Sequence, residues 1–351
     1  MMNKNEFANY IADNIKNYLP PEYRFAEIQI KEGVKNNDIT LTGVEIRRPE
    51  EAIVPVIYVD GLYEKYVLGA ELSTLVSEAA STRIEYDAGK VTKSNPEADI
   101  NDMLHDYTRA KEKIQVFLCN TERNQSRLRG AVRREVGEFS ELYRLCIPFG
   151  DKEGSIAISP NMLKDWGISA EQLHEDAIIA ENKREPFLAT MHSVVDQLMF
   201  GSEPINILSE ADPMQDFLMD NLYVLSTADK MNGAHMMLRD DILTKAGDFF
   251  GEDFYVLPSS VHEVLLVPMN TEMDPWELNE TVRSINGDDQ VMNPMDILSD
   301  NAYSYDRGRH VLTNTRTGDS IDLRRDGKFI QNAPQPVPEN KPYKPKKKQS
   351  R

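Results

Sequence analysis

The chain has few cysteines and few histidines, and this scarcity limits the chemistry that it can support. Only two cysteines are present, Cys119 and Cys146, and each lies in an apolar stretch, so a disulfide framework is excluded and buried free thiols are predicted. The six histidines include no pair at zinc-binding spacing, and no CxxC motif accompanies them. Neither a metal nor a cofactor is therefore predicted, and a reducing cytoplasm is the expected location.

Long apolar runs and phosphate-binding loops are also missing. No stretch approaches the roughly 18 consecutive apolar residues that a membrane-spanning helix needs, and the first residues read as an amphipathic helix rather than a signal peptide. Neither GxGxxG nor GxxxxGK[ST] occurs in the chain. The sequence thus predicts no membrane association and no nucleotide hydrolysis by these designs.

Acidic side chains dominate what is present. The net charge is −18 over 351 residues, and residues 341–351 carry six basic side chains and no acidic one, so the rest of the chain carries −24. A body of this charge repels phosphate backbones and anionic lipids. Nucleic-acid binding is therefore expected to be weak and to need a local basic segment.

The periodicity of the apolar residues predicts an α+β protein with small mixed sheets, helices and two or three compact units. Strand-like runs and helical repeats alternate, and Ser159, Ser169 and Asp274 stand at predicted helix N-caps. Apolar residues at helical spacing from Met103 to Phe117 predict a long helix. The predicted divisions are a unit with helices and a small sheet at 1–88, a mainly helical unit with a hairpin at 98–199, a second mixed unit at 214–325, and a disordered tail rich in proline and lysine at 334–351.

The stretch PSSVHEVLLVP, residues 258–268, places hydroxyls, an imidazole and a carboxylate before an apolar run. The weak catalytic candidates are Ser259, Ser260, His262 and Glu263. Leu266 occupies the place of the second histidine of HExxH, and GxSxG is absent, so neither a zinc protease nor a standard serine hydrolase is indicated. The alternative is a turn whose hydroxyls satisfy local backbone groups before a core strand, and the sequence favours it.

Residues 109–134 depart from the acidic average. They hold eight basic side chains against Glu112 and Glu122. One interpretation is a phosphate-binding face. The other, which we favour, is a pair of basic helices that pair with the protein's own acidic residues, such as Glu135, Glu138 and Glu141. No aromatic residues alternate with the arginines as a stacking platform for single strands would need.

Several short motifs together resemble the bacterial domain-of-unknown-function family 5688. They are VKNN (34–37), PVIY (55–58) with YEKY (63–66) and Gly69, NLYVL (221–225) with Gly233 and Ala234, LPSSVHE (257–263), and ILSDNAY (297–303). The resemblance covers about residues 5–306. It implies a cytoplasmic protein of Firmicutes, encoded near mobile genetic elements, with no established activity and no catalytic residues to carry over.

For function, the sequence predicts a non-catalytic interaction or accessory protein with an unidentified protein partner. A hydrolase-like enzyme with a site near Ser260, His262 and Glu263 stays open as an alternative, as does weak nucleic-acid contact through residues 109–134 or the basic tail. Nothing in the sequence specifies the oligomeric state.

Overall fold

The α+β class is confirmed by a computed structural model, which describes residues 1–51, 54–91, 103–149, 152–209, 221–269 and 273–331. The predicted tail at 334–351 lies outside these residues. Two compact units are present: unit 1 contains residues 1–106 and 146–155, and unit 2 contains residues 107–145 and 156–334. The divisions predicted near residues 88–98 and 199–214 stay predictions. No helix in the described part of the chain is long and apolar enough to cross a membrane.

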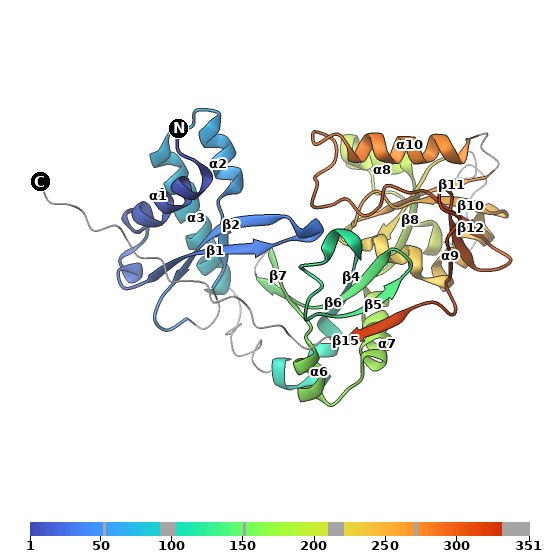
Figure 1. Cartoon of the computed structure of the whole chain (residues 1–351), viewed down its shortest axis with the longest axis horizontal. Helices are drawn as coiled ribbons and strands as arrows, with labels where there is room; N and C mark the ends of the chain where they lie inside the picture. The colour runs from blue at the N-terminus through green and yellow to red at the C-terminus, as the bar shows by residue number, and fades with distance from the viewer. Residues whose placement is uncertain (52–53, 92–102, 150–151, 210–220, 270–272, 332–351) are drawn as a thin grey trace, which may run out of the picture. The chain divides into compact units, whose positions relative to one another are not determined.

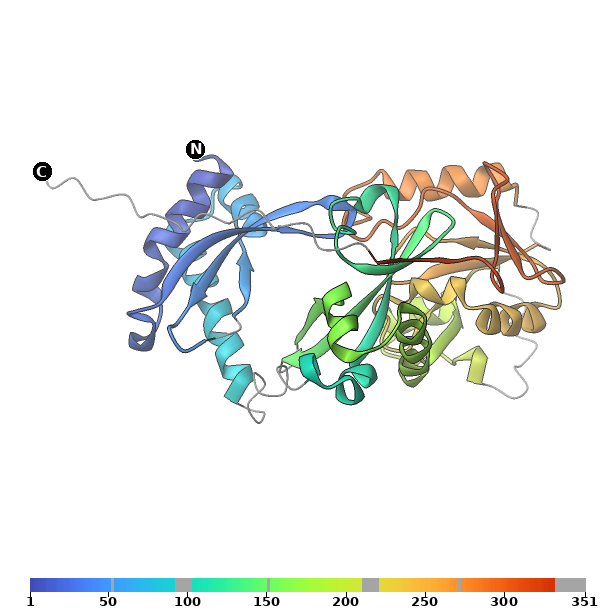
Figure 2. The same cartoon turned by 60° about the horizontal axis from the view of Figure 1, so that its bottom comes forward.

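Unit 1 is a three-stranded antiparallel sheet with helices on one face (Figure 1). Its strands have the order β1-β2-β3, and β1 and β2 form a long hairpin that extends beyond the helices (Figure 2). The elements are α1 (Lys4–Asn14), η1 (Ile15–Tyr18), η2 (Pro21–Tyr23), β1 (Glu27–Val34), η3 (Asn36–Asp38), β2 (Thr40–Arg47), β3 (Val56–Tyr58), α2 (Asp60–Val67) and α3 (Leu72–Val91).

Helix α1 begins where its sequence specifies. The side chain of Asn3 accepts a hydrogen bond from the amide of Glu6, and the Glu6 carboxylate accepts one from the amide of Asn3, which is a complete capping box. Its apolar residues Phe7 and Ile11 lie one turn apart and are fully buried against the sheet and α3. The core of unit 1 therefore forms between one helical face and one sheet face.

A buried arginine organises the end of this core. Arg83 of α3 has no exposed surface, and its Nη2 lies 2.6 and 2.7 Å from the two carboxylate oxygens of Glu51. Its Nη1 donates to Asp87, whose other oxygen accepts from the hydroxyl of Tyr23. Arg48 adds a second guanidinium 2.9 Å from Glu51. A buried charge is tolerated only when it is paired and hydrogen-bonded, and this network meets both conditions.

The network predicts acid sensitivity of unit 1. Burial alone would raise the pKa of Glu51, but hydrogen bonds from Arg83 and Arg48 outweigh it and lower the pKa to about 2. Because the folded-state pKa lies below the unfolded value, this contribution is complete above about pH 4.5 and disappears as the pH falls toward 2. Its size is about 3 kcal/mol. Urea denaturation of unit 1 between pH 5 and pH 2 should show this loss, and Glu51→Gln should flatten the profile.

Two further sheets with their helices make up unit 2, apart from residues 146–155, which belong to unit 1. In the first sheet the strand order is β15-β5-β6-β4, with β7 paired to β6, and in the second it is β14-β13-β12-β10-β11-β9-β8. The first group of elements is α5 (Tyr107–Ala110), η4 (Lys111–Lys113), β4 (Ile114–Asn120), η5 (Glu122–Asn124), β5 (Val132–Val136), β6 (Phe139–Phe149), β7 (Lys152–Ala157), α6 (Pro160–Trp166), α7 (Ala170–Glu181), η6 (Asn182–Arg184) and β15 (Lys328–Gln331). The second is β8 (Pro186–Thr190), α8 (Met191–Phe200), η7 (Ile207–Ser209), β9 (Tyr223–Thr227), η9 (Gly233–Leu238), α9 (Asp240–Phe250), β10 (Phe254–Leu257), β11 (Val264–Pro268), α10 (Pro275–Asn286), β12 (Tyr303–Asp306), β13 (Val311–Asn314) and β14 (Ser320–Asp322).

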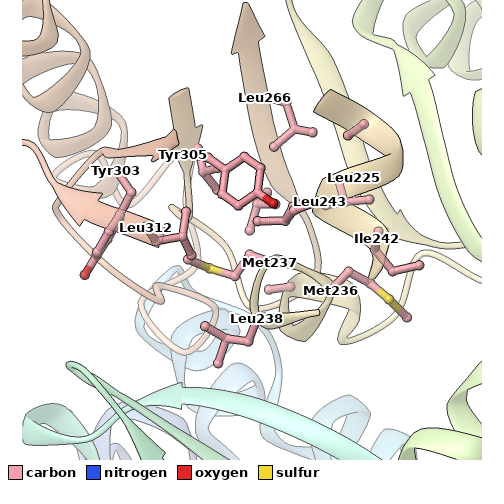
Figure 3. Packing of buried hydrophobic residues seen from close by; sticks show 14 of the residues in the cluster. Leu225, Met236, Met237, Leu238, Ile242, Leu243, Leu266, Tyr303, Tyr305 and Leu312 are labelled. Carbon is pink, nitrogen blue, oxygen red and sulfur yellow. The ribbon is translucent and has the colours of Figure 1, made fainter. Parts of the chain in front are cut away.

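The seven-stranded sheet is buried on both faces at its centre. In β11, Val264 and Leu266 pack into the main core of unit 2, which also includes Met236 and Met237 of η9 and Leu243 of α9 (Figure 3). The alternate residues of the same strand point to the opposite face, where they join a cluster with Leu278 and Val282 of α10. Side chains alternate across a strand, so a strand covered on both faces must be apolar throughout. This accounts for the unbroken run after the PSSVHE motif.

The long helix predicted from Met103 to Phe117 is wrong. Helix α5 ends at Ala110, and β4 starts at Ile114 and pairs with β6 from Ile114↔Leu145 to Asn120↔Phe139. The apolar residues of this segment fit the alternation of a strand as well as the spacing of a helix. In the strand that forms, residues 114, 116 and 118 are buried. Pairing with β6 decided between these two patterns, because it satisfies the backbone of β4 and buries one of its faces.

Candidate functional site

The PSSVHE corner joins β10 to β11 and is held mainly by backbone hydrogen bonds. Its first residues pair with residues 296–299: the carbonyls of Pro258 and Ser259 accept from Ser299 and Leu298, each at 2.9 Å. The Ser260 hydroxyl accepts from the amide of His262 at 3.0 Å, and its side chain is buried. The serine hydroxyl therefore caps a turn of its own chain, as the structural interpretation of the motif predicted.

The imidazole of His262 is likewise engaged with its surroundings. Its Nδ1 accepts from the amide of Asn232 at 3.1 Å, and its Nε2 lies 3.5 Å from Oδ1 of Asp296. An accepting Nδ1 places the proton of the neutral ring on Nε2, toward the carboxylate. The ring therefore has no free lone pair with which to take a proton from a substrate or a serine. The structure brings Ser260 and His262 together as a turn, with Ser259 buried and Glu263 half-buried beside them.

The segment that precedes η9 closes tightly on this corner. The carbonyl of His262 accepts from the amide of Gly233 at 2.8 Å and from the hydroxyl of Ser226 at 2.7 Å. A Cβ on Gly233 would lie 2.3 Å from the Ser226 hydroxyl and 2.5 Å from the amide nitrogen of Thr227. Only glycine allows two backbone segments to approach so closely. The turn at residues 231–235 thus fastens η9 to β9 and to the corner.

Among the other histidines of unit 2 that lie beside carboxylates, His235 and His310 have the most buried side chains. His235 and Glu181 are both fully buried, with 3.6 Å between Nε2 and the carboxylate. His310 Nδ1 lies 2.6 Å from Asp240, and Arg324 lies 2.7 Å from its Nε2. Within the described residues no group of three or more His, Cys, Asp and Glu side chains is placed to hold a metal ion.

Both of these pairs connect elements of the fold. Glu181 also accepts from the amide of Val116 at 2.9 Å and from Arg184, which itself binds Asp229. The pair of His310 and Asp240 fastens the β12–β13 turn to the first residue of α9. Such linked polar groups stabilise a particular packing when every member is satisfied, and here Nε2 of His235 is buried without a hydrogen-bond partner among the described residues.

The basic segment at 109–134 pairs with acidic residues of unit 2. It forms a short helix, two strands and a turn instead of the predicted helix pair. Arg133 lies 2.8 Å from Glu135, and Arg134 lies 2.9 Å from Glu141. Glu138, the third predicted acidic partner, instead accepts from neutral donors, among them Ser299 at 2.7 Å. Pairing within the protein removes much of the local positive charge that a phosphate-binding face would need.

Unit 1 contains an open groove that sequence analysis did not identify. It has a volume of about 630 Å³, and β3, α2 and α3 line it. Leu68, at the end of α2, leaves 87% of its surface exposed there. The lining residues are Val56, Ile57, Tyr58, Gly61, Leu62, Glu64, Lys65, Leu68, Glu78 and Thr82. The one sequence signal was Pro55 before a three-residue apolar strand, which is typical of a sheet edge.

A second apolar surface lies at the end of α8 in unit 2. Leu198, Met199 and Phe200 expose 81, 69 and 72% of their surfaces. Large exposed apolar groups that are contiguous commonly mark interaction sites. The groove of unit 1 differs because a strand edge runs along it, so it offers main-chain hydrogen bonds as well as apolar contacts.

These features define an α+β protein with a strand-edge groove, and with its conspicuous polar residues used in structural contacts. The comparison with family models then identifies the chain: residues 4–307 match a family of unknown function (DUF5688), and the chain belongs to that family. The family resemblance predicted from the motifs is therefore confirmed. Neither the search of curated proteins nor the search of solved structures gave a match.

Proposed function

We propose that this protein is a non-catalytic interaction protein, and that it binds a partner protein through the groove of unit 1. The observation that carries the proposal is the groove itself: about 630 Å³ in volume, with apolar residues of β3 and α2 in its lining. A cytoplasmic location and an accessory role near mobile elements belong to the same proposal. They rest on the low cysteine content and on the family resemblance.

The rival function, a hydrolase centred on Ser260, His262 and Glu263, receives less support from the geometry. A hydrolytic base needs a free lone pair directed at the nucleophile. In this protein the backbone of Asn232 occupies Nδ1 of His262, and the Ser260 hydroxyl accepts from the backbone. Nucleic-acid binding through residues 109–134 also receives less support, since Arg133 and Arg134 pair with glutamates.

Replacing His262 with alanine separates the interaction protein from the hydrolase. We expect a loss of about 1–3 kcal/mol in the free energy of unfolding, because the amide of Asn232 loses its acceptor. We expect no turnover of esters, phosphoesters or peptides by either form. Chemical denaturation and a substrate panel make the two measurements.

His192→Ala is the matched control. The side chain of His192 is 77% exposed, so its removal should change stability by no more than about 0.5 kcal/mol. Turnover by the wild type that disappears in a stably folded His262→Ala variant would overturn the proposal in favour of the hydrolase.

A further inference from the structure

The β3 strand lies at the edge of its sheet, and its hydrogen-bonding directions can be assigned from the register. β3 pairs with β2 on one side, through Gly43↔Tyr58, Val44↔Ile57 and Glu45↔Val56. The amide of Val59 donates to the carbonyl of Thr42 at 2.9 Å. Hydrogen-bonded and non-hydrogen-bonded pairs alternate along an antiparallel ladder. Ile57 therefore bonds to β2, and the main-chain groups of Val56 and Tyr58 point to the open edge.

The side chains of β3 divide between the two faces of the sheet. Ile57 is buried among the helices. Its neighbours Val56 and Tyr58 point to the other face, where they lie against glycines. A Cβ on Gly33 would be 2.4 Å from the tyrosine oxygen, and a Cβ on Gly43 would be 2.3 Å from a methyl of Val56. These glycines hold β3 flat against β2, with its outer edge beside the groove.

We propose that the partner binds as an extended peptide that adds a strand to β3. This inference rests on the proposed function. Residues directly opposite each other on paired strands have their side chains on the same face. The peptide residue opposite Ile57 would thus enter the groove between α2 and α3, over Leu62 and Leu68. Main-chain bonds to Val56 and Tyr58 would supply affinity, and the groove would select an apolar side chain at that position.

Charge further specifies the partner. Residues 1–106 carry 19 acidic and 11 basic side chains. Glu64 and Glu78 line the groove with a single lysine, Lys65, which is paired with Glu78. A peptide with lysine or arginine beside its apolar anchor fits this field, whereas a second copy of the chain, with its net charge of −18, is repelled.

The test uses the full-length protein and a displayed library of nine-residue peptides. Selected peptides should carry alternating apolar residues and at least one basic residue.

Val56→Pro removes an outward amide while leaving the bonds to β2, and it should weaken the binding of the selected peptides about tenfold or more. The isosteric Val56→Thr, which keeps the amide, should bind as the wild type does. Leu68→Lys, at an exposed position, is a second variant with little cost to folding and should also weaken binding.

Amide hydrogen exchange locates the bound peptide. In the free protein the amides of Val56 and Tyr58 should exchange faster than that of Ile57, and a selected peptide should slow both. Peptides that bind without slowing these amides, and equally to Val56→Pro, would overturn the strand addition but leave the interaction function standing. A library that gives no binder would count against both. If the protein associated with itself and Val56→Pro abolished that association, the groove would be occupied by a second copy of the chain instead of a partner peptide.

Discussion

Arg83→Met should lower the free energy of unfolding of unit 1 by about 3–5 kcal/mol. The substitution leaves the Glu51 carboxylate, which is only 3% exposed, without the guanidinium that lies 2.6 Å away. Breaking a buried pair from one side costs this much because the remaining charge stays desolvated: Glu51 keeps its pair with Arg48 but loses both contacts with Arg83. Glu51→Leu should cause a loss of similar size, since it leaves the buried Arg83 with Asp87 as its charged partner and the carbonyl of Ile46 as an acceptor. Calorimetry with urea denaturation would measure both.

The double substitution provides the sharper measurement. With Glu51→Leu and Arg83→Met together, no unpaired charge of this pair remains, so the loss should be clearly smaller than the sum of the two single losses. Lys65→Met is the control, because its ion pair with Glu78 is exposed on both sides and should contribute less than about 1 kcal/mol. Additive losses from the two single variants would show that the pair is not coupled as the structure indicates.

Gly233→Ala should be a strongly destabilising single-methyl change in unit 2. The new Cβ meets the backbone nitrogen of Thr227 at 2.5 Å, and backbone cannot rotate away as a flexible side chain can. Relief would require η9 to move from β9, which stretches the 2.8 Å bond to the carbonyl of His262. Overpacking and a weakened buried hydrogen bond together should cost about 3 kcal/mol, measured by thermal unfolding of unit 2.

Gly308→Ala is the matched control for this substitution. Gly308 is exposed in the β12–β13 turn, and a Cβ there would lie 3.5 Å from Asp306, an ordinary contact. Its stability should change by about 0.5 kcal/mol at most. Equal stability of the two variants would mean that η9 does not fit against β9 as closely as the structure shows.

Part of the candidate site could be predicted from the sequence. The motif at 258–263 could be interpreted as a turn before a core strand because serine hydroxyls cap local backbone groups, and Ser260 does so. Its partners could not be predicted, since Asn232 and Asp296 approach His262 only through the folding of η9 and of the segment after α10. The groove was missed for the same reason: its lining comes from β3, α2 and α3, and only the sheet order leaves β3 at an edge.

What the sequence determined by itself was local. Ser159, Ser169 and Asp274 each accept a hydrogen bond from an amide in the first turn of their helices, because capping depends on residues only two or three apart. The α+β class followed from apolar periodicities that local geometry dictates. Tertiary structure alone decided that Ile114 starts a strand, that Arg83 is buried against Glu51, and that β3 keeps an open edge. Each of these depends on which distant segment supplies the hydrogen bonds and the covering surface, and spacing along one segment carries no information about that choice.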